Sequence, residues 1–273
     1  MNSNLLLRVA TGLVFLALLA LAVYFGFTWM LALAFGCTAL ALWEFYNLFW
    51  PGTTHFTDKL IGMGMAVILF AGAWLHHEAG PRYIAIDNLM VAMALCLLIA
   101  ATIFLIRYGT GCETTRLSDT ALTMLGVLYI PMPMVLALLQ TREQLLLLLA
   151  VVASTDTCAY FAGNLWGKRR IWPKVSPKKS VEGCLGGILG SVLVCLGFGI
   201  YHDTMTGISV CLGIFLAVFA ILGDFFESAL KRAHGVKDSG ILLPGHGGML
   251  DRLDSFLFVV PAYTVLNLLV CLT

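Results

Sequence analysis

Residues 9–43 have the sequence VATGLVFLALLALAVYFGFTWMLALAFGCTALALW, which contains no charged side chain. A membrane-spanning helix needs about 20 mostly apolar residues, so this stretch is too long for a single span. Gly26, Phe27 and Thr28 offer a break, which predicts two helices near residues 9–25 and 29–48. The stretch therefore indicates a protein that crosses a membrane more than once.

The rest of the 273-residue chain continues this pattern. Hydrophobic residues make up 60% of the sequence and charged residues 11%, whereas a soluble domain is roughly 45–50% apolar and about 25% charged. This composition excludes a disordered chain, a nucleic-acid-binding domain and a typical cytosolic enzyme. Seven more helices are predicted near residues 60–77, 88–106, 120–141, 144–165, 183–202, 204–223 and 255–273. We therefore expect an all-α, polytopic integral membrane protein with about nine transmembrane helices.

The basic residues predict the orientation of these helices. Nine alternating spans place 14 of the 16 Lys and Arg residues on one face and leave Arg82 and Arg142 on the other. Lys and Arg are retained on the cytoplasmic side of a membrane, so the richer face is expected to be cytoplasmic. The N-terminus would then lie inside and the C-terminus outside. The first span is expected to stay uncleaved, because no clear small-residue cleavage site follows it.

The scarce charges collect in two segments. Residues 156–182 contain eight of the 31 charged residues, and residues 224–254 contain nine. Both segments reach the face that is expected to be cytoplasmic, and both mix acids with bases. These two segments therefore contain the main candidate functional residues.

Four aspartates in these segments are candidate metal ligands: Asp156, Asp224, Asp251 and Asp254. Asp156 falls inside an apolar span, where an ionised carboxylate is costly unless it is paired, hydrated or bound to a cation. Asp251 and Asp254 head the last span and would share a face near the positive helix N-terminus. Paired carboxylates at such a place suit Mg²⁺, whose ligands are oxygens. The alternatives are a structural partner for Asp156 and simple helix capping by Asp254 or Ser255.

The polar end of the eighth span is a related feature. If the helix continues past residue 223, then Asp224, Glu227 and Lys231 lie on one face. Solvation of a helix end is the alternative. Glu44, at the expected cytoplasmic end of the second span, is a weaker candidate, because an acid at the membrane interface explains it equally well.

Basic residues and glycines near these acids suit phosphate groups. Six bases fall within residues 168–179, although positive-inside retention with attraction to anionic lipid also explains them. His246 is flanked by glycines at 245, 247 and 248, which allow a backbone to approach a ligand closely. Acids for a metal and bases for phosphates, at membrane level, suggest phosphoryl or nucleotidyl transfer onto a lipid phosphate.

The run from Ser228 to Asp254 resembles the signature of the phosphatidate cytidylyltransferase family. It contains SALKR at 228–232, KD at 237–238 and PGHGGMLDRLD at 244–254. The segments DTCAYFAG at 156–163 and SPKKSVEG at 176–183 also look like family segments, although the family more often has Thr at the place of Ser180. The resemblance covers mainly residues 156–255.

The resemblance implies that CTP and phosphatidic acid give CDP-diacylglycerol and pyrophosphate for phospholipid biosynthesis. It implies Mg²⁺ dependence, with K⁺ as a further candidate cation. It also implies an integral protein of the bacterial inner membrane, often a homodimer, with its active site facing the cytosol. A CTP-dependent lipid kinase and, from another class, a secondary transporter are the alternatives. We expect one continuous membrane domain, with scaffold helices in residues 1–140 and the catalytic loops in residues 141–273.

Carried over residue by residue, the resemblance implies a role for each matching position. The expected catalytic residues are Asp224, Asp251, Asp254, Lys231, Arg232 and His246. The expected substrate-binding residues are Ser176, Lys178, Lys179, Ser180, Ser228, Lys237, Asp238, Gly247, Gly248 and Arg252. The expected metal ligands are Asp224, Asp251, Asp254 and Asp156.

Overall fold

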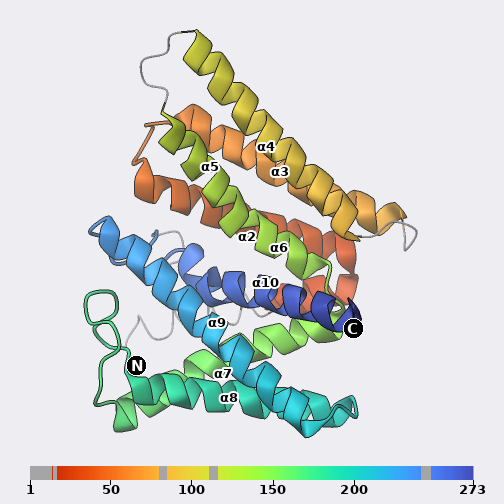
Figure 1. The fold of residues 1–273 in the computed structure, drawn as a ribbon, viewed down its shortest axis with the longest axis vertical. Helices are drawn as coiled ribbons and strands as arrows, with labels where there is room; N and C mark the ends of the chain where they lie inside the picture. The colour runs from red at the N-terminus through yellow and green to blue at the C-terminus, as the bar shows by residue number, and fades with distance from the viewer. Residues whose placement is uncertain (1–13, 15–16, 80–84, 111–115, 241–246, 273) are drawn as a thin grey trace. The chain divides into compact units, whose positions relative to one another are not determined.

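The computed structural model describes residues 14, 17–79, 85–110, 116–240 and 247–272, and the regular elements in this part of the chain are helices (Figure 1). Eight spans of these residues are long and apolar enough to cross a membrane. They match eight of the nine expected spans, which confirms the all-α polytopic membrane class. The remaining expected span, near residues 9–25, lies partly outside the described residues, and residues 17–25 of it are helical.

The chain divides into two compact units. The first contains Met1–Leu139 together with Ser239–Leu250, and the second contains Gln140–Asp238 and Asp251–Thr273. The segment Ser239–Leu250 thus belongs to the unit of the N-terminal helices, although it follows α9 in the sequence.

The first unit contains α2 (Phe27–Phe49), α3 (Phe56–Ala79), α4 (Ala85–Gly109), α5 (Leu117–Tyr129) and α6 (Pro131–Leu138). The last two helices form one span, Leu117–Leu138, that is interrupted at Ile130. The interruption has a local cause, because Pro131 lacks the N–H that would continue the helical hydrogen bonds.

Tyr46 of α2 lies at the centre of the first unit. Its side chain is fully buried, and its hydroxyl donates to the carbonyl oxygen of Thr123 at 2.7 Å. Its ring lies against Gly62 of α3 and Gly126 of α5, where a Cβ would overlap the ring. Glycines at these two positions therefore let α3 and α5 close around an aromatic side chain.

Lys59 of α3 is a buried cation in the same unit. Its ammonium donates to the side-chain oxygen of Asn47 at 2.6 Å and to the carbonyl oxygen of Gly52 at 2.7 Å. It also lies 5.2 Å from the centroid of the Trp43 ring. Because the whole residue is 0% exposed, its ammonium is satisfied by these partners inside the unit and adds nothing to a basic surface.

The second unit contains α7 (Arg142–Trp166), α8 (Val181–Tyr201), α9 (Thr206–Ala233) and α10 (Leu250–Leu272) from Asp251 onward. α8 packs against both α7 and α9 (Figure 1). The contact with α7 depends on glycines, since a Cβ at Gly187 would lie 2.9 Å from the carbonyl oxygen of Thr155. These two helices therefore approach backbone to backbone.

α9 and α10 extend beyond the spans that hydropathy predicts. α9 continues to Ala233, so Asp224, Glu227 and Lys231 are helical, and α10 begins at Leu250. The capping role considered for Asp254 and Ser255 is therefore wrong, because both residues lie inside the helix. The extension is stabilised by apolar neighbours of the charges, because Phe225 and Leu253 are buried.

Candidate active site

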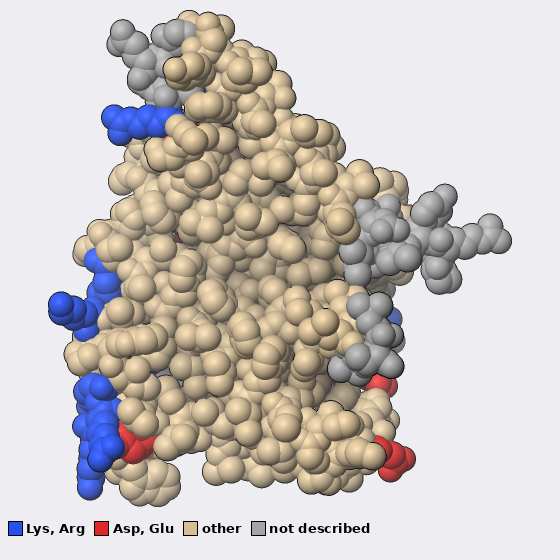
Figure 2. All heavy atoms as spheres, viewed as in Figure 1, with Lys and Arg blue, Asp and Glu red and all other residues tan. Residues whose placement is uncertain are grey.

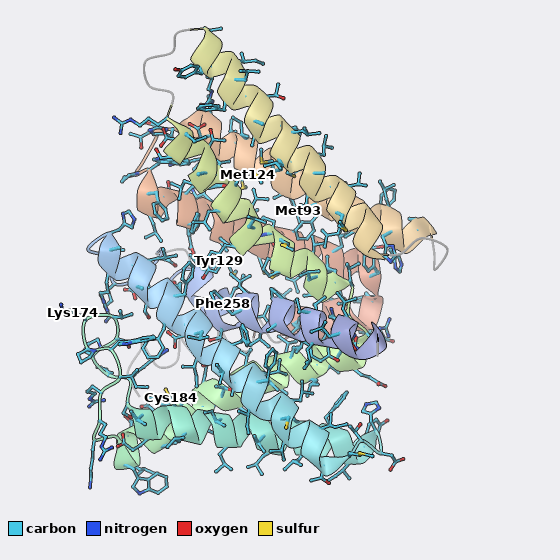
Figure 3. All side chains as sticks on the ribbon, in the orientation of Figure 1. Met93, Met124, Tyr129, Lys174, Cys184 and Phe258 are labelled. Atoms are coloured by element: carbon cyan, nitrogen blue, oxygen red, sulfur yellow. The ribbon has the colours of Figure 1, made fainter. Side chains whose placement is uncertain are left out.

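A cavity of about 390 Å³ in the second unit is lined by residues of α7, α8 and α9. Its volume falls within the range of small-molecule sites. One member, Cys184, is labelled at the start of α8 in Figure 3. The polar side chains that line it are Thr155, Asp156, Tyr160, Asn164, Lys178, Lys179, Ser180, Cys184 and Asp224.

One face of α7 supplies a polar wall of this cavity, with Asp156 as its acid. Asp156, Tyr160, Gly163 and Asn164 follow one another at helical spacing, and all four line the cavity. Asn164 was not among the expected residues. Because Asn164 lies two helical turns after Asp156, the sequence could have predicted that both residues share one face of the helix.

Asp224 of α9 and Lys179 meet in the cavity as an ion pair. The hydroxyl of Ser228 donates to Asp224 Oδ1 at 3.3 Å, and the Lys179 ammonium lies 4.4 Å from the centroid of the Phe225 ring. The side chains of Lys179 and Asp224 are 25% and 30% exposed, so a ligand in the cavity can reach both. Three of the expected site residues thus come together here.

The loop between α7 and α8 presents the lysines to the cavity. Glu182 accepts hydrogen bonds from the backbone N–H groups of Lys168 at 3.0 Å and Arg169 at 3.2 Å. Ser180 caps α8 by accepting from the N–H of Gly183 at 3.1 Å. These contacts close the loop at its base, and Figure 2 shows its basic side chains gathered at one end of the second unit.

Two further contacts fix the middle of this loop. Trp172 packs edge-to-face on Phe225 of α9, with ring centroids 4.9 Å apart. Arg232 donates from Nε to the carbonyl oxygen of Val175 at 3.4 Å. The loop is therefore tied to α9, whereas Lys174 lies on its outer turn (Figure 3).

Asp254 joins Asp156 and Asp224 as the third acid of the site. The charges of these three carboxylates act on one another, and Lys179 is close enough to counter them. Asp254 Oδ1 accepts from the N–H of Ser255 at 2.7 Å. The part of α10 that carries Asp254 packs directly on α9, because a Cβ at Gly223 of α9 would come within 3.0 Å of the Ser255 Cα.

Asp251 belongs to a different group. Lys231 Nζ lies 2.5 Å from Asp251 Oδ1 and also forms an ion pair with Glu227. The side chains are 12% exposed for Lys231, 10% for Asp251 and 1% for Glu227. Buried charges need partners, so this triad links α9 to α10. The sequence placed Glu227 on the same helix face as Asp224 and Lys231 but assigned it no role.

The three aspartates provide oxygen donors that suit a hard cation. No three His, Cys, Asp or Glu side chains within the described ranges converge closely enough to hold a metal by themselves. Mg²⁺ does not require that, since it is usually held by one or two carboxylates together with water and substrate phosphates. Asp156, Asp224 and Asp254 fit such a partial ligand set.

The other expected residues lie at the edges of the site or away from it. Arg232 also donates to the carbonyl oxygen of Val236 at 3.1 Å, so it tethers the segment that follows α9. Lys237 and Asp238 are exposed on that segment, and Ser176 is half-buried in the basic loop. Arg252 is exposed, and its charge acts on Asp156.

The glycine motif is only partly described. Gly247 has a φ of 80°, a conformation that favours glycine, and Gly248 is buried within the first unit. The expected catalytic residue His246 lies outside the described residues.

Helices that cross a membrane and a cavity lined by acids and lysines define an integral membrane protein with a polar site. The chain belongs to the cytidylyltransferase family, whose family model matches residues 6–270.

Relatives with a more specific description support this assignment. Phosphatidate cytidylyltransferase of Staphylococcus saprophyticus is 42% identical over 177 residues, which cover 62% of this chain and 67% of the relative. The protein of the same description from Staphylococcus aureus strain COL is 33% identical over 235 residues, which cover 83% of this chain and 85% of the relative.

Proposed function

We propose that this protein transfers the cytidylyl group of CTP to phosphatidic acid, giving CDP-diacylglycerol and pyrophosphate for phospholipid biosynthesis. The observation that carries the proposal is the cavity in which Asp156 and Asp224 meet Lys178 and Lys179 among membrane-spanning helices. Membership of the cytidylyltransferase family and relatives described as phosphatidate cytidylyltransferases support the same reaction.

The chemistry requires alignment of two phosphates and neutralisation of their charge. A phosphate oxygen of phosphatidic acid attacks the α-phosphorus of CTP, the bond to the β-phosphate oxygen breaks, and pyrophosphate leaves in line. The lipid phosphate is already an oxyanion at neutral pH, so a general base is not needed. Lys178 and Lys179 are placed to bind phosphate oxygens, and the Asp224 carboxylate and Phe225 ring orient Lys179.

Asp156, Asp224 and Asp254 are the residues that would hold Mg²⁺, which when bound neutralises charge on the phosphate oxygens. K⁺ remains a further candidate cation on the family resemblance alone. Lys231 and Arg232, which contact protein groups here, have a positioning role in this proposal.

The protein is an integral membrane protein. We place it in a bacterial inner membrane with the cavity facing the cytosol, because CTP is cytosolic and because the basic loop Lys168–Lys179 borders the cavity. The bacterial source of the relatives supports this membrane. A homodimer is the proposed assembly, on the family resemblance alone.

The test is an assay of the purified protein in detergent with Mg²⁺, phosphatidic acid and CTP labelled at the α-phosphate. We expect labelled CDP-diacylglycerol and an equal amount of pyrophosphate, loss of both with EDTA, and recovery when excess Mg²⁺ is added. Formation of CDP and a newly phosphorylated lipid would instead identify a lipid kinase and contradict the proposal.

A further inference from the structure

Glu44 is a buried carboxylate in the first unit, on the second of the expected spans. The residue is 3% exposed and lies in the second half of α2. Its Oε2 accepts from the backbone N–H of Leu250 at 2.9 Å and from the hydroxyl of Ser239 at 3.3 Å. Glu44 therefore contacts both ends of the segment Ser239–Leu250, about 200 residues away in sequence.

The segment is shaped to receive this carboxylate. A Cβ built on Gly240 would overlap the Glu44 side chain, and Cγ of Glu44 would be 3.0 Å away. A Cβ on Gly248 would come within 2.9 Å of the Glu44 Cδ. Glycines on both sides thus let the backbone close on the carboxylate. Gly240 has no positive φ, so its requirement for glycine is one of space.

The contact with Leu250 fixes the beginning of a functional helix. Leu250 is the first residue of α10, and its N–H is one of those that a helix start leaves without a partner inside the helix. A carboxylate bound there is favoured by the helix dipole. Asp251 and Asp254 follow in the first two turns of α10, so the position of Leu250 sets theirs.

A purely packing role does not explain a carboxylate at this place. Burying a charged oxygen is costly, and the Oε1 atom of Glu44 is buried without a hydrogen-bond partner in the part of the chain that the structure describes. Leu or Met would fill the same volume without that cost. What a carboxylate adds is the ability to accept hydrogen bonds from Leu250 and Ser239.

We propose that Glu44 is a positioning residue, which holds the segment Ser239–Leu250 and the N-terminus of α10 so that the α10 acids reach their working places. The inference rests on the proposed function for its effect on turnover. Its effect on structure is independent of which reaction the protein catalyses.

The first test measures backbone protection by hydrogen exchange of the full-length protein. In Glu44→Ala, amide exchange should become at least about tenfold faster at Leu250 and its neighbours, because the N–H loses its acceptor. Exchange in α3 and α8 should stay as in the wild type. Glu44→Gln, which keeps an acceptor oxygen, should restore part of the protection.

The second test measures kcat and KM. In Glu44→Ala, kcat should fall on the order of a hundredfold, because small displacements of catalytic groups have effects of that size. The KM for CTP should change by less than about threefold, and Glu44→Gln should recover part of kcat. Glu78→Gln, an exposed glutamate on α3 of the same unit, is the matched control.

A double-mutant cycle tests the contact itself. Gly240→Ala should lower kcat as Glu44→Ala does, since its Cβ would displace the carboxylate. In the Glu44→Ala background, Gly240→Ala should cause little further loss. Gly64→Ala, a helical glycine with open space at its Cβ position, is the control.

Three outcomes would overturn the inference: unchanged exchange at Leu250 in Glu44→Ala, full additivity in the cycle, or faster exchange throughout the first unit. The last result would show a general structural role. If the wild type lacked cytidylyl transfer, the proposed function would fail, while the exchange experiment would still decide the role of Glu44.

Discussion

At the scale of single residues, four aspartates with the same expected role divide into two groups. Asp254 shares its surroundings with Asp156 and Asp224, whose charges act on it. Asp251, only three positions earlier, forms an ion pair with Lys231. Replacing a cavity aspartate should therefore affect mainly turnover, whereas disrupting the ion pair of Asp251 should affect mainly stability. The sequence alone gives no reason to separate the two groups.

The cavity aspartates should affect turnover more than stability. Asp156→Asn and Asp224→Asn should each lower the rate of CDP-diacylglycerol formation by about a hundredfold or more, as loss of one charge-stabilising group typically does. Because both line an open cavity, the melting temperature should change little. The control is Asp203→Asn, since Asp203 is exposed with a φ of 53° that asparagine accepts. Near-wild-type rates in both variants would contradict the assignment.

The buried triad should affect stability. Lys231→Met removes the cation that pairs with Glu227 and Asp251, and breaking a buried pair in this way costs roughly 3–5 kcal/mol. We expect a clear fall in melting temperature in detergent, part of which Glu227→Gln should recover in the double variant. Lys174→Met, on the exposed turn of the basic loop, should leave the melting temperature unchanged. An unchanged value for Lys231→Met would show that the triad is not structural.

At the scale of elements, hydropathy predicted most of the helices but not where α9 and α10 end or begin. A window of apolar residues stops at the first charge, whereas a helix continues as long as its backbone bonds and packing allow. Asp224 and Lys231 are helical because Phe225 between them is buried. The sequence therefore identified the charged residues at the ends of α9 and α10, but it did not predict that they are helical.

The site was predictable where its residues are close in sequence. Lys178, Lys179 and Ser180 occur together in a recognisable segment, and all three line the cavity. The contact between Glu44 and Leu250 spans 206 positions, and no periodic pattern in one sequence reports such a pairing. Glu44 could only be weighed as an acid near the interface until its partners were known.

The crossing of α9 and α10 leads to a prediction at this scale. Gly223 lies against the backbone of Asp254 and Ser255, and backbone atoms cannot move aside as a side chain can. Gly223→Ala should force the helices apart, destabilise the protein by about 1–3 kcal/mol and reduce activity by displacing Asp254. Thermal unfolding and the transfer assay measure the two effects. Gly197→Ala in α8, where the added Cβ meets nothing, should change neither.

At the scale of the whole molecule, the surface is that of a protein in hydrocarbon. Large apolar side chains are exposed along the helices, such as Leu98 and Leu105 on α4 and Leu189 on α8. In water such exposure would favour association, whereas in a bilayer it contacts lipid. The charged residues outside the spans gather in the connections, and six bases lie in the one between α7 and α8.

The difference in charge between two connections of the second unit predicts the topology. The topology decides whether the cavity can receive cytosolic CTP. The connection from α7 to α8 carries six bases, whereas the turn between α8 and α9 contains Asp203 and no Lys or Arg. By the positive-inside rule the first lies in the cytoplasm and the second outside. In an active variant without native cysteines, a membrane-impermeant maleimide should label Asp203→Cys in intact cells. Lys174→Cys and Val236→Cys should be labelled only after permeabilisation. The reverse pattern would place the basic loop outside the cell, away from the nucleotide that the proposed reaction consumes.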